Sequence, residues 1–315
     1  MSSGADHLAA LRTGGKQAVA RALTALERGL DPAGAPDAET ADLLDAAIAD
    51  PTGIVIGLTG PPGVGKSTLT GELLTSWRKA GLSVGVIAVD PSSQITGGAL
   101  LGDRTRIRTA PDDDKAFVRS LAARDRLGGL SDHSVAAALL MRAVYDRVIV
   151  ETVGIGQSEA DIGLIADTLV LCVQPGSGDS LQFMKAGIME LPDVIAVTKS
   201  DMGAAARRAR ADVEGALGLV ATGIADWKVP VVALSAASGE GIDDLLAAIS
   251  SHRAWLDEDR HLAQRRQDQA RAFMRDFVKS RHGRAGLNRV VTEIASADAR
   301  KPFEALRRLV KFLDR

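Results

Sequence analysis

The sequence lacks several features that mark other classes of protein. Its 315 residues include one cysteine, Cys172, so no internal disulfide can form, as is usual in the reducing cytoplasm. No run of about 18 apolar residues occurs, and the first residues do not join a basic segment to an apolar one. We therefore expect a soluble cytoplasmic protein that is neither exported nor inserted in a membrane.

The chain also has little net charge and no clustered metal ligands. Its 38 basic and 40 acidic residues give a net charge of −2, so no basic field indicates nucleic acid or an anionic membrane as a partner. The five histidines are scattered and no C-x-x-C pair occurs, so zinc or nickel binding has no sequence pattern here. With 46% apolar residues, the chain can bury a full core.

Residues 60–67 fit the phosphate-binding pattern G-x-x-x-x-G-K-[ST] and follow the apolar run 54–58. Glycines in such a loop allow consecutive backbone N–H groups to curl around a triphosphate. Lys66 would place a positive charge between the β- and γ-phosphates, Ser67 would offer a hydroxyl to Mg²⁺, and a helix from Thr68 to about Ala80 would point its positive end at the same oxygens. The nucleotide-binding residues predicted here are Gly60, Pro61, Pro62, Gly63, Val64, Gly65, Lys66, Ser67 and Thr68.

The pattern of apolar residues divides the chain into three parts. Residues 1–50 show two helical stretches, 7–30 and 37–50, separated by a break at 31–36. Residues 251–315 show helical spacing only, and this extension either packs on its own domain or forms a subunit-binding arm. Residues 51–250 alternate helical stretches with short strand-like runs at 54–58, 84–89, 147–151, 169–173, 194–198 and 231–234. Strand runs without polar alternation are buried on both faces, which predicts an α/β P-loop NTPase fold with a mostly parallel sheet flanked by helices.

Three acidic residues are candidate metal ligands. A parallel sheet binds its ligand beyond the carboxyl ends of the strands, and Asp90 and Glu151 each end a predicted strand. Asp103 lies in the segment Gly102-Asp-Arg-Thr-Arg106. Each could bind Mg²⁺ directly or through water, because this ion prefers hard oxygen ligands.

The segment Thr198-Lys-Ser-Asp201 is similar to the guanine-selecting signature N-K-x-D. Asp201 could accept from the adjacent N1–H and N2–H₂ groups of guanine, a donor pair that adenine lacks, so GTP should be preferred over ATP. The stem of Lys199 would cover the face of the base, and backbone amides at Ser235 and Ala236 would meet its O6. Thr198 replaces the usual Asn and loses the amide that ties this loop to the phosphate loop, which predicts weaker selectivity.

Six segments together resemble the MeaB/ArgK family of G proteins. Two strings, Glu-Thr-Val-Gly-x-Gly-Gln-Ser-Glu and Gly-Asp-Arg-Thr-Arg, are typical of that family, and the resemblance covers about residues 15–250. The segments are Gly60–Thr68, Val89–Ser93, Leu101–Arg106, Leu127–Ser131, Val150–Glu159 and Gln174–Asp179.

The resemblance implies a function and a set of roles. Members are chaperones of adenosylcobalamin-dependent acyl-CoA mutases such as methylmalonyl-CoA mutase; they hydrolyse GTP slowly with Mg²⁺, dimerise through C-terminal helices and control cofactor loading and repair. By this resemblance Ser67, Asp90, Asp103 and Glu151 serve the metal and the switches, and Lys199 and Asp201 read guanine. Asp179, Gln182 and Lys185 fall in a stretch that is similar to the partner-responsive third switch.

The catalytic groups are predicted less directly. Ile155 follows Gly154, at the position where many small GTP-binding proteins carry a water-orienting Gln, so we expect slow turnover alone and faster turnover with a partner. Gln157 or Glu151 could position the water, and the sequence does not choose between them. The expected catalytic set is Lys66, Asp103, Glu151 and Gln157.

The sequence fits three other functions less well. A nickel-delivery GTPase resembling UreG or HypB would need metal ligands that the sequence does not supply. A nucleotide-gated adaptor would hydrolyse GTP only incidentally. A kinase would need a base for its substrate hydroxyl, and the motifs provide none.

Overall fold

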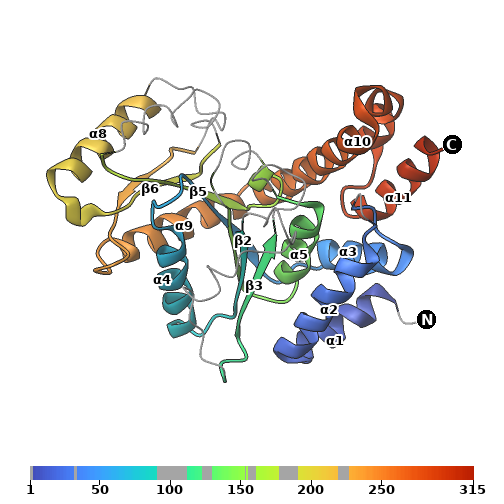
Figure 1. The fold of residues 1–315 in the computed structure, drawn as a ribbon, viewed down its shortest axis with the longest axis horizontal. Helices are drawn as coiled ribbons and strands as arrows, with labels where there is room; N and C mark the ends of the chain where they lie inside the picture. The colour runs from blue at the N-terminus through green and yellow to red at the C-terminus, as the bar shows by residue number, and fades with distance from the viewer. Residues whose placement is uncertain are drawn as a thin grey trace, which may run out of the picture.

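A seven-stranded parallel sheet forms the centre of the molecule in the computed structural model (Figure 1). The structure describes residues 3–31, 34–90, 112–122, 130–152, 154, 161–176, 191–218 and 227–315. The strand order is β3-β2-β4-β1-β5-β6-β7, and each neighbouring pair runs parallel. The strands are β1 Ile54–Thr59, β2 Val84–Asp90, β3 Ala116–Ala122, β4 Arg147–Glu151, β5 Thr168–Val173, β6 Val194–Val197 and β7 Val231–Ala233.

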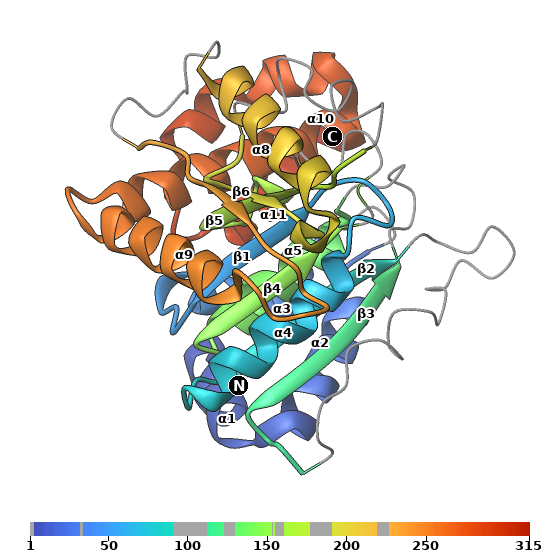
Figure 2. The same ribbon diagram turned by 90° about the vertical axis from the view of Figure 1, so that its left-hand side faces the viewer.

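Helices cover both faces of this sheet. Figures 1 and 2 show α4 and α9 on one side, and α5 with the amino-terminal helices on the other. The helices are α1 Gly4–Thr13, α2 Gly15–Gly29, α3 Ala38–Ala49, α4 Lys66–Lys79, α5 Asp132–Arg142, α8 Ala204–Leu217, α9 Ile242–Asp257, α10 His261–Ser296 and α11 Pro302–Leu313, with a short 3₁₀ helix η1 at Ser200–Met202. The predicted α/β P-loop architecture is confirmed.

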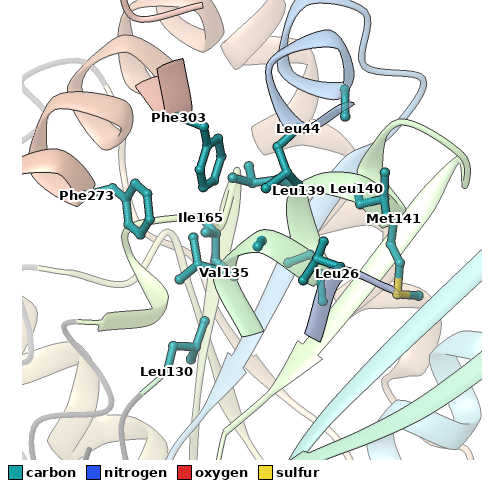
Figure 3. Close-up of a cluster of buried hydrophobic side chains, with 14 of the residues drawn as sticks. Leu26, Leu44, Leu130, Val135, Leu139, Leu140, Met141, Ile165, Phe273 and Phe303 are labelled. Carbon is teal, nitrogen blue, oxygen red and sulfur yellow. The ribbon is translucent and has the colours of Figure 1, made fainter. Parts of the chain in front are cut away.

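The buried side chains explain this layering. Within β1, Val55 packs with the cluster under α5, whereas Ile56 packs with the cluster under α4, because neighbouring side chains of a strand point to opposite faces. The first cluster also takes in residues from both ends of the chain, including Leu44 and Phe303, which lie together in Figure 3. Burial on both faces accounts for the fully apolar strands.

Two elements differ from the prediction: one helical stretch is divided in two, and one strand was not predicted. The stretch 7–30, expected to be one helix, is two helices, because α1 ends and α2 begins at Gly14 and Gly15, the latter with φ of 65°. Strand β3 was not predicted, because Arg119 and Ser120 interrupt its apolar pattern. It pairs with β2 only and forms the edge of the sheet, where polar side chains are tolerated.

The carboxyl-terminal helices pack on their own chain. Phe273 and Phe277 of α10 and Phe303 of α11 are buried in the cluster that contains Leu44 of α3. Helix α9 runs through residue 250, the predicted domain boundary, and Gly283, with φ of 67°, kinks α10. Over the described ranges, no helix is long and apolar enough to cross a membrane.

Candidate nucleotide site

The phosphate loop connects β1 to α4, at the carboxyl end of the central strand. Gly60, Gly63 and Gly65 have φ of 136°, 75° and 101°, a region that favours glycine. A Cβ on Gly60 would lie 2.2 Å from Cys172 O, whereas a Cβ on Gly63 or Gly65 would meet nothing within 4 Å. Gly60 is therefore required by close packing, and the other two by the turn of the backbone.

Cys172 packs behind this loop as a neutral side chain. It is fully buried in β5, next to the strand that carries the loop. Burial raises the pKa of its thiol to about 12, so the thiol stays protonated at neutral pH. This matches the prediction of a packed strand residue.

Lys66 opens α4 and reaches back over the loop. Its Nζ donates to Gly60 O at 2.7 Å and to Pro61 O at 3.1 Å, and the residue is only 6% exposed. The helix has no side-chain cap at Gly65, and the positive end of its dipole lies at the loop, which favours an anion there. The loop therefore combines an ammonium group with backbone donors, as phosphate binding requires.

Glu151 ends β4 and is hydrogen-bonded to α4. It is 4% exposed, and its Oε1 accepts from Ser67 Oγ at 2.7 Å while its Oε2 accepts from Thr70 Oγ1 at 3.0 Å. The structure thus brings together Ser67 and Glu151, two of the predicted metal ligands. Hydroxyl and carboxylate oxygens are the donors that Mg²⁺ prefers, so this pair fits the ion. In the described ranges no group of three His, Cys, Asp or Glu side chains gathers as a metal site.

Thr70 was missed by sequence reasoning. Its hydroxyl orients the Glu151 carboxylate from one turn into α4, and the side chain is fully buried. A threonine three residues after Ser67 lies near it on the same helix face, which was the only signal available.

Gly154 lies against the phosphate loop. Its φ is 74°, and a Cβ at this position would be 1.6 Å from Gly60 O and 3.1 Å from Lys66 Nζ. No residue with a side chain fits there. Gly154 is therefore in direct contact with the loop; its predicted role in binding nucleotide stays a prediction.

Thr198 corrects one expectation. Its Oγ1 lies 2.8 Å from Val64 O in the phosphate loop and 3.0 Å from Val173 O at the end of β5, and the residue is 3% exposed. The loss of the usual amide was expected to untie this loop from the phosphate loop. The hydroxyl, which can donate to Val64 O, makes that connection instead.

Lys199 forms a second link between the two loops. It adopts a left-handed conformation with φ of 56°, and its Nζ donates to Gly63 O at 2.9 Å and to Gln174 Oε1 at 2.6 Å. The side chain thus crosses from β6 to the phosphate loop, where its stem could cover a base. Gln174, which follows β5, was not predicted as a site residue.

Asp201 and the loop after β7 lie at the same edge of the sheet. Asp201 is exposed in η1, and Ser200 N donates to Leu234 O at 3.0 Å, so the two segments are joined. Ser235 N donates to Glu240 O at 2.9 Å. The amide of Ser235, predicted to meet the guanine O6, therefore already has an acceptor within the protein, and the role of the Ala236 amide stays a prediction.

Several predicted residues lie outside the part of the chain that the structure describes. They are Asp103, Gln157, Asp179, Gln182 and Lys185. Asp90 ends β2, at the carboxyl edge of the sheet as predicted, but its side chain is not described. Their roles remain predictions.

Comparisons with known proteins point to one group. The family described as methylmalonyl Co-A mutase-associated GTPase MeaB matches residues 19–288. A putative GTPase of Pyrococcus horikoshii is 40% identical over 266 residues, which cover 81% of this chain and 80% of that protein. The mitochondrial methylmalonic aciduria type A homolog of Mus musculus is 37% identical over 230 residues, which cover 71% of this chain and 55% of that protein.

A solved structure agrees with these sequence matches. The crystal structure of an LAO/AO transport system kinase superposes with a TM-score of 0.69 at 28% identity. The superposition covers 99% of this chain and 98% of that one, so the terminal helices are included.

Proposed function

The chain belongs to the MeaB family of methylmalonyl-CoA mutase-associated GTPases, and from this membership we propose that its GTP cycle controls a partner acyl-CoA mutase. The chain is a GTPase. The proposed partner is methylmalonyl-CoA mutase or a close relative, and the proposed task is to gate the loading, protection or repair of its adenosylcobalamin cofactor. The nucleotide state would report to the mutase through the switch segments.

One observation carries the nucleotide part of this proposal. Lys199 Nζ donates to Gly63 O, so the loop proposed to read the base is joined to the loop proposed to bind the phosphates. A guanosine triphosphate would span this junction, with its base near Asp201 and its phosphates along residues 60–68. Backbone donors, Lys66 and the start of α4 would stabilise the phosphate charge.

The residues around Glu151 support a magnesium site. Ser67 would bind the ion directly and Glu151 would act on its shell, and the ion when bound supplies positive charge to the phosphate oxygens. Because Glu151 already accepts from Ser67 Oγ and Thr70 Oγ1, we assign it to a water or hydroxyl of the ion's shell rather than to direct ligation. Asp90 and Asp103 are the further proposed ligands.

Intrinsic hydrolysis is proposed to be slow. Ile155 follows Gly154, so the position of a water-orienting glutamine is apolar. The proposed catalytic set is Lys66, Asp103, Glu151 and Gln157, and the proposed partner-sensing set is Asp179, Gln182 and Lys185. A partner that orders these segments would raise the rate.

The terminal helices are proposed to assemble the protein. The proposed division is 1–50, 51–250 and 251–315, the last part being a dimerisation arm. Val291 of α10 and Phe312 of α11 are 49% and 52% exposed, which leaves apolar surface on this arm for a second copy. A cytoplasmic location completes the proposal.

The test is GTP turnover measured with increasing concentrations of methylmalonyl-CoA mutase. We expect a low rate for the chain alone and a saturable increase with the mutase, together with GTP-dependent co-purification of the two proteins. Lys66→Ala is the matched control, because it should abolish triphosphate binding and with it the stimulation. A rate that is the same at every mutase concentration would refute the partner, whereas normal GTP affinity in Lys66→Ala would refute the site.

A further inference from the structure

A cavity lies at the amino ends of the strands, on the opposite side of the molecule from the nucleotide site. It has a volume of about 480 Å³ and is lined by the end of α3, by α5, by the α9–α10 connection with the first part of α10, and by the residues that lead into α11. Arg142 lies on its wall, and its carbonyl accepts from Thr52 N and Gly53 N just before β1 begins. The cavity therefore lies near the amino ends of the strands, whereas the phosphate loop follows their carboxyl ends.

Most of the cavity wall is apolar. Side chains from α5 and α10 face it, and Val135, Leu139 and Phe273 are drawn in Figure 3 as part of the buried cluster. Small-molecule sites in proteins have volumes of about 300–1,000 Å³ and predominantly apolar walls with a few polar groups. The principal apolar lining residues are Val135, Leu139, Leu164, Leu256, Ala270 and Phe273.

Arg142 is the unusual polar group in this wall. The residue is 2% exposed, and its Nε has no hydrogen-bond partner among the described residues. Its ionic partner, Asp167, is 4.0 Å away, measured from Nη1 to Oδ1. A buried guanidinium with so little compensation is costly unless an anion or an acceptor joins it.

Asp167 compensates the charge of Arg142 only through space, at 4.0 Å, while its oxygens accept hydrogen bonds from other residues. Arg266 Nε donates to Oδ1 at 2.8 Å, and Arg266 Nη2 donates to Oδ2 at 2.8 Å. Val55 N also donates to Oδ2, at 2.8 Å. Burial, together with Arg266, lowers the pKa of Arg142 to about 10, which leaves it charged at neutral pH.

The rim of the cavity adds positive charge. Arg260 and Arg300 both line it, and the one acid among the described lining residues, Asp257, is paired with Arg253 at 2.8 Å. Arg300 is paired with Asp298 in an exposed contact. The cavity as a whole is an apolar space with an excess of guanidinium groups.

We propose that this cavity binds a small amphipathic carboxylate, with its headgroup at Arg142 and its apolar chain between α5 and α10. A carboxylate would give the guanidinium the charge-assisted hydrogen bonds that it lacks. An inorganic anion would not use the apolar walls, and a neutral apolar molecule would leave Arg142 Nε without a hydrogen-bond acceptor. The ligand class is therefore a carboxylic acid with a short hydrocarbon chain.

Titration calorimetry of the full chain with octanoate tests this assignment, with octanol as the matched neutral probe. Octanoate should bind saturably, at least about tenfold more tightly than octanol, because hydrogen bonds to a buried charge contribute more than neutral ones. Equal affinity for the two probes, or no saturable heat from octanoate, would overturn the proposal.

Two variants separate the headgroup from the chain. Arg142→Met should remove the preference for octanoate over octanol, whereas Arg275→Met, an exposed position on α10 outside the cavity, should keep it. Ala270→Phe should fill the space and abolish binding of both probes, whereas Ala285→Phe, exposed on the same helix, should not. Unchanged octanoate binding in Ala270→Phe would place the ligand elsewhere and refute the site.

Discussion

At the scale of single residues, Thr198 shows how a shorter side chain can keep a connection between loops. Its Oγ1 is within hydrogen-bond distance of both Val64 O and Val173 O. The hydroxyl has one hydrogen, so it donates to one of these carbonyls at a time or shares the hydrogen between them. The phosphate loop is thereby held to the end of β5 and the start of the base-reading loop.

Thr198→Val should weaken GTP binding. The substitution keeps the shape but removes the hydroxyl donor from Val64 O, whereas Val173 O keeps Thr198 N as its donor. The loss costs about 0.5–1.5 kcal/mol, or about two- to tenfold in affinity if the loop must be ordered on binding. Fluorescent GTP-analogue titration measures this. Thr198→Ser keeps the hydroxyl and should bind nearly as the unaltered protein does; equal loss in both variants would contradict a specific role for the hydroxyl.

At the scale of secondary-structure elements, helix α11 depends on an acid from a distant helix. Asp45 of α3 accepts from Phe303 N at 3.0 Å and from Glu304 N at 2.9 Å, and Lys301, at the N-cap position, makes no side-chain cap. Asp45 thus caps α11 from more than 250 residues away in sequence. Burial raises the pKa of Asp45 to about 6.

The raised pKa of Asp45 makes the free energy of unfolding depend on pH, and the direction of this dependence can be derived. Because the folded state holds the Asp45 proton more tightly than the unfolded state, whose pKa is about 3.8, this group favours folding most at low pH. Its contribution is fully present below about pH 3.8 and is lost as the pH rises through about 6.

Asp45→Asn should remove that dependence. The free energy of unfolding of the unaltered protein, relative to the variant, should fall between about pH 4 and about pH 6.5 and be level above about pH 7. Urea unfolding over this pH series measures the difference. A constant difference would mean that Asp45 does not titrate in the fold as described.

At the scale of the whole molecule, ion pairs anchor helix α10 to the sheet at the amino ends of two strands. Arg265 pairs with Asp193 through two hydrogen bonds, at 2.8 and 2.7 Å, and Arg266 pairs with Asp167 in the same way. Both acids are buried: Asp167 immediately precedes β5, and Asp193 immediately precedes β6. Helix α10, which belongs to the proposed dimerisation arm, is therefore anchored to the strands that carry the nucleotide loops at their other ends.

Arg265→Met should destabilise the fold strongly. The buried Asp193 carboxylate would lose its bidentate partner, which costs about 3–5 kcal/mol. Arg253→Met is the matched control, because Arg253 pairs with Asp257 on the exposed surface of α9, where such pairs contribute less than about 1 kcal/mol. Urea unfolding compares the two, and similar losses would contradict a special role for the buried pair.

The sequence predicted the features that follow from local patterns, such as apolar runs and glycine spacing. It did not predict the features that depend on contacts between elements distant in sequence. The strands around residues 54–58 and 147–151 were found because burial on both faces leaves a continuous apolar run. Edge strand β3 was not, because its pattern contains Arg119 and Ser120. The phosphate loop follows from glycine spacing, whereas Thr70, Gln174 and the hydroxyl link of Thr198 depend on contacts between elements distant in sequence.

The account rests on the proposal that Asp201, beyond the carboxyl ends of the strands, selects guanine. The most direct test is competitive binding of GTP, ATP and xanthosine triphosphate to the unaltered protein and to Asp201→Asn. The unaltered protein should prefer GTP, and the variant should lose about tenfold to a hundredfold in GTP affinity while keeping or gaining affinity for xanthosine triphosphate, whose C2 carbonyl can accept from the new amide. Equal loss for both nucleotides, or no preference for GTP over ATP in the unaltered protein, would contradict it.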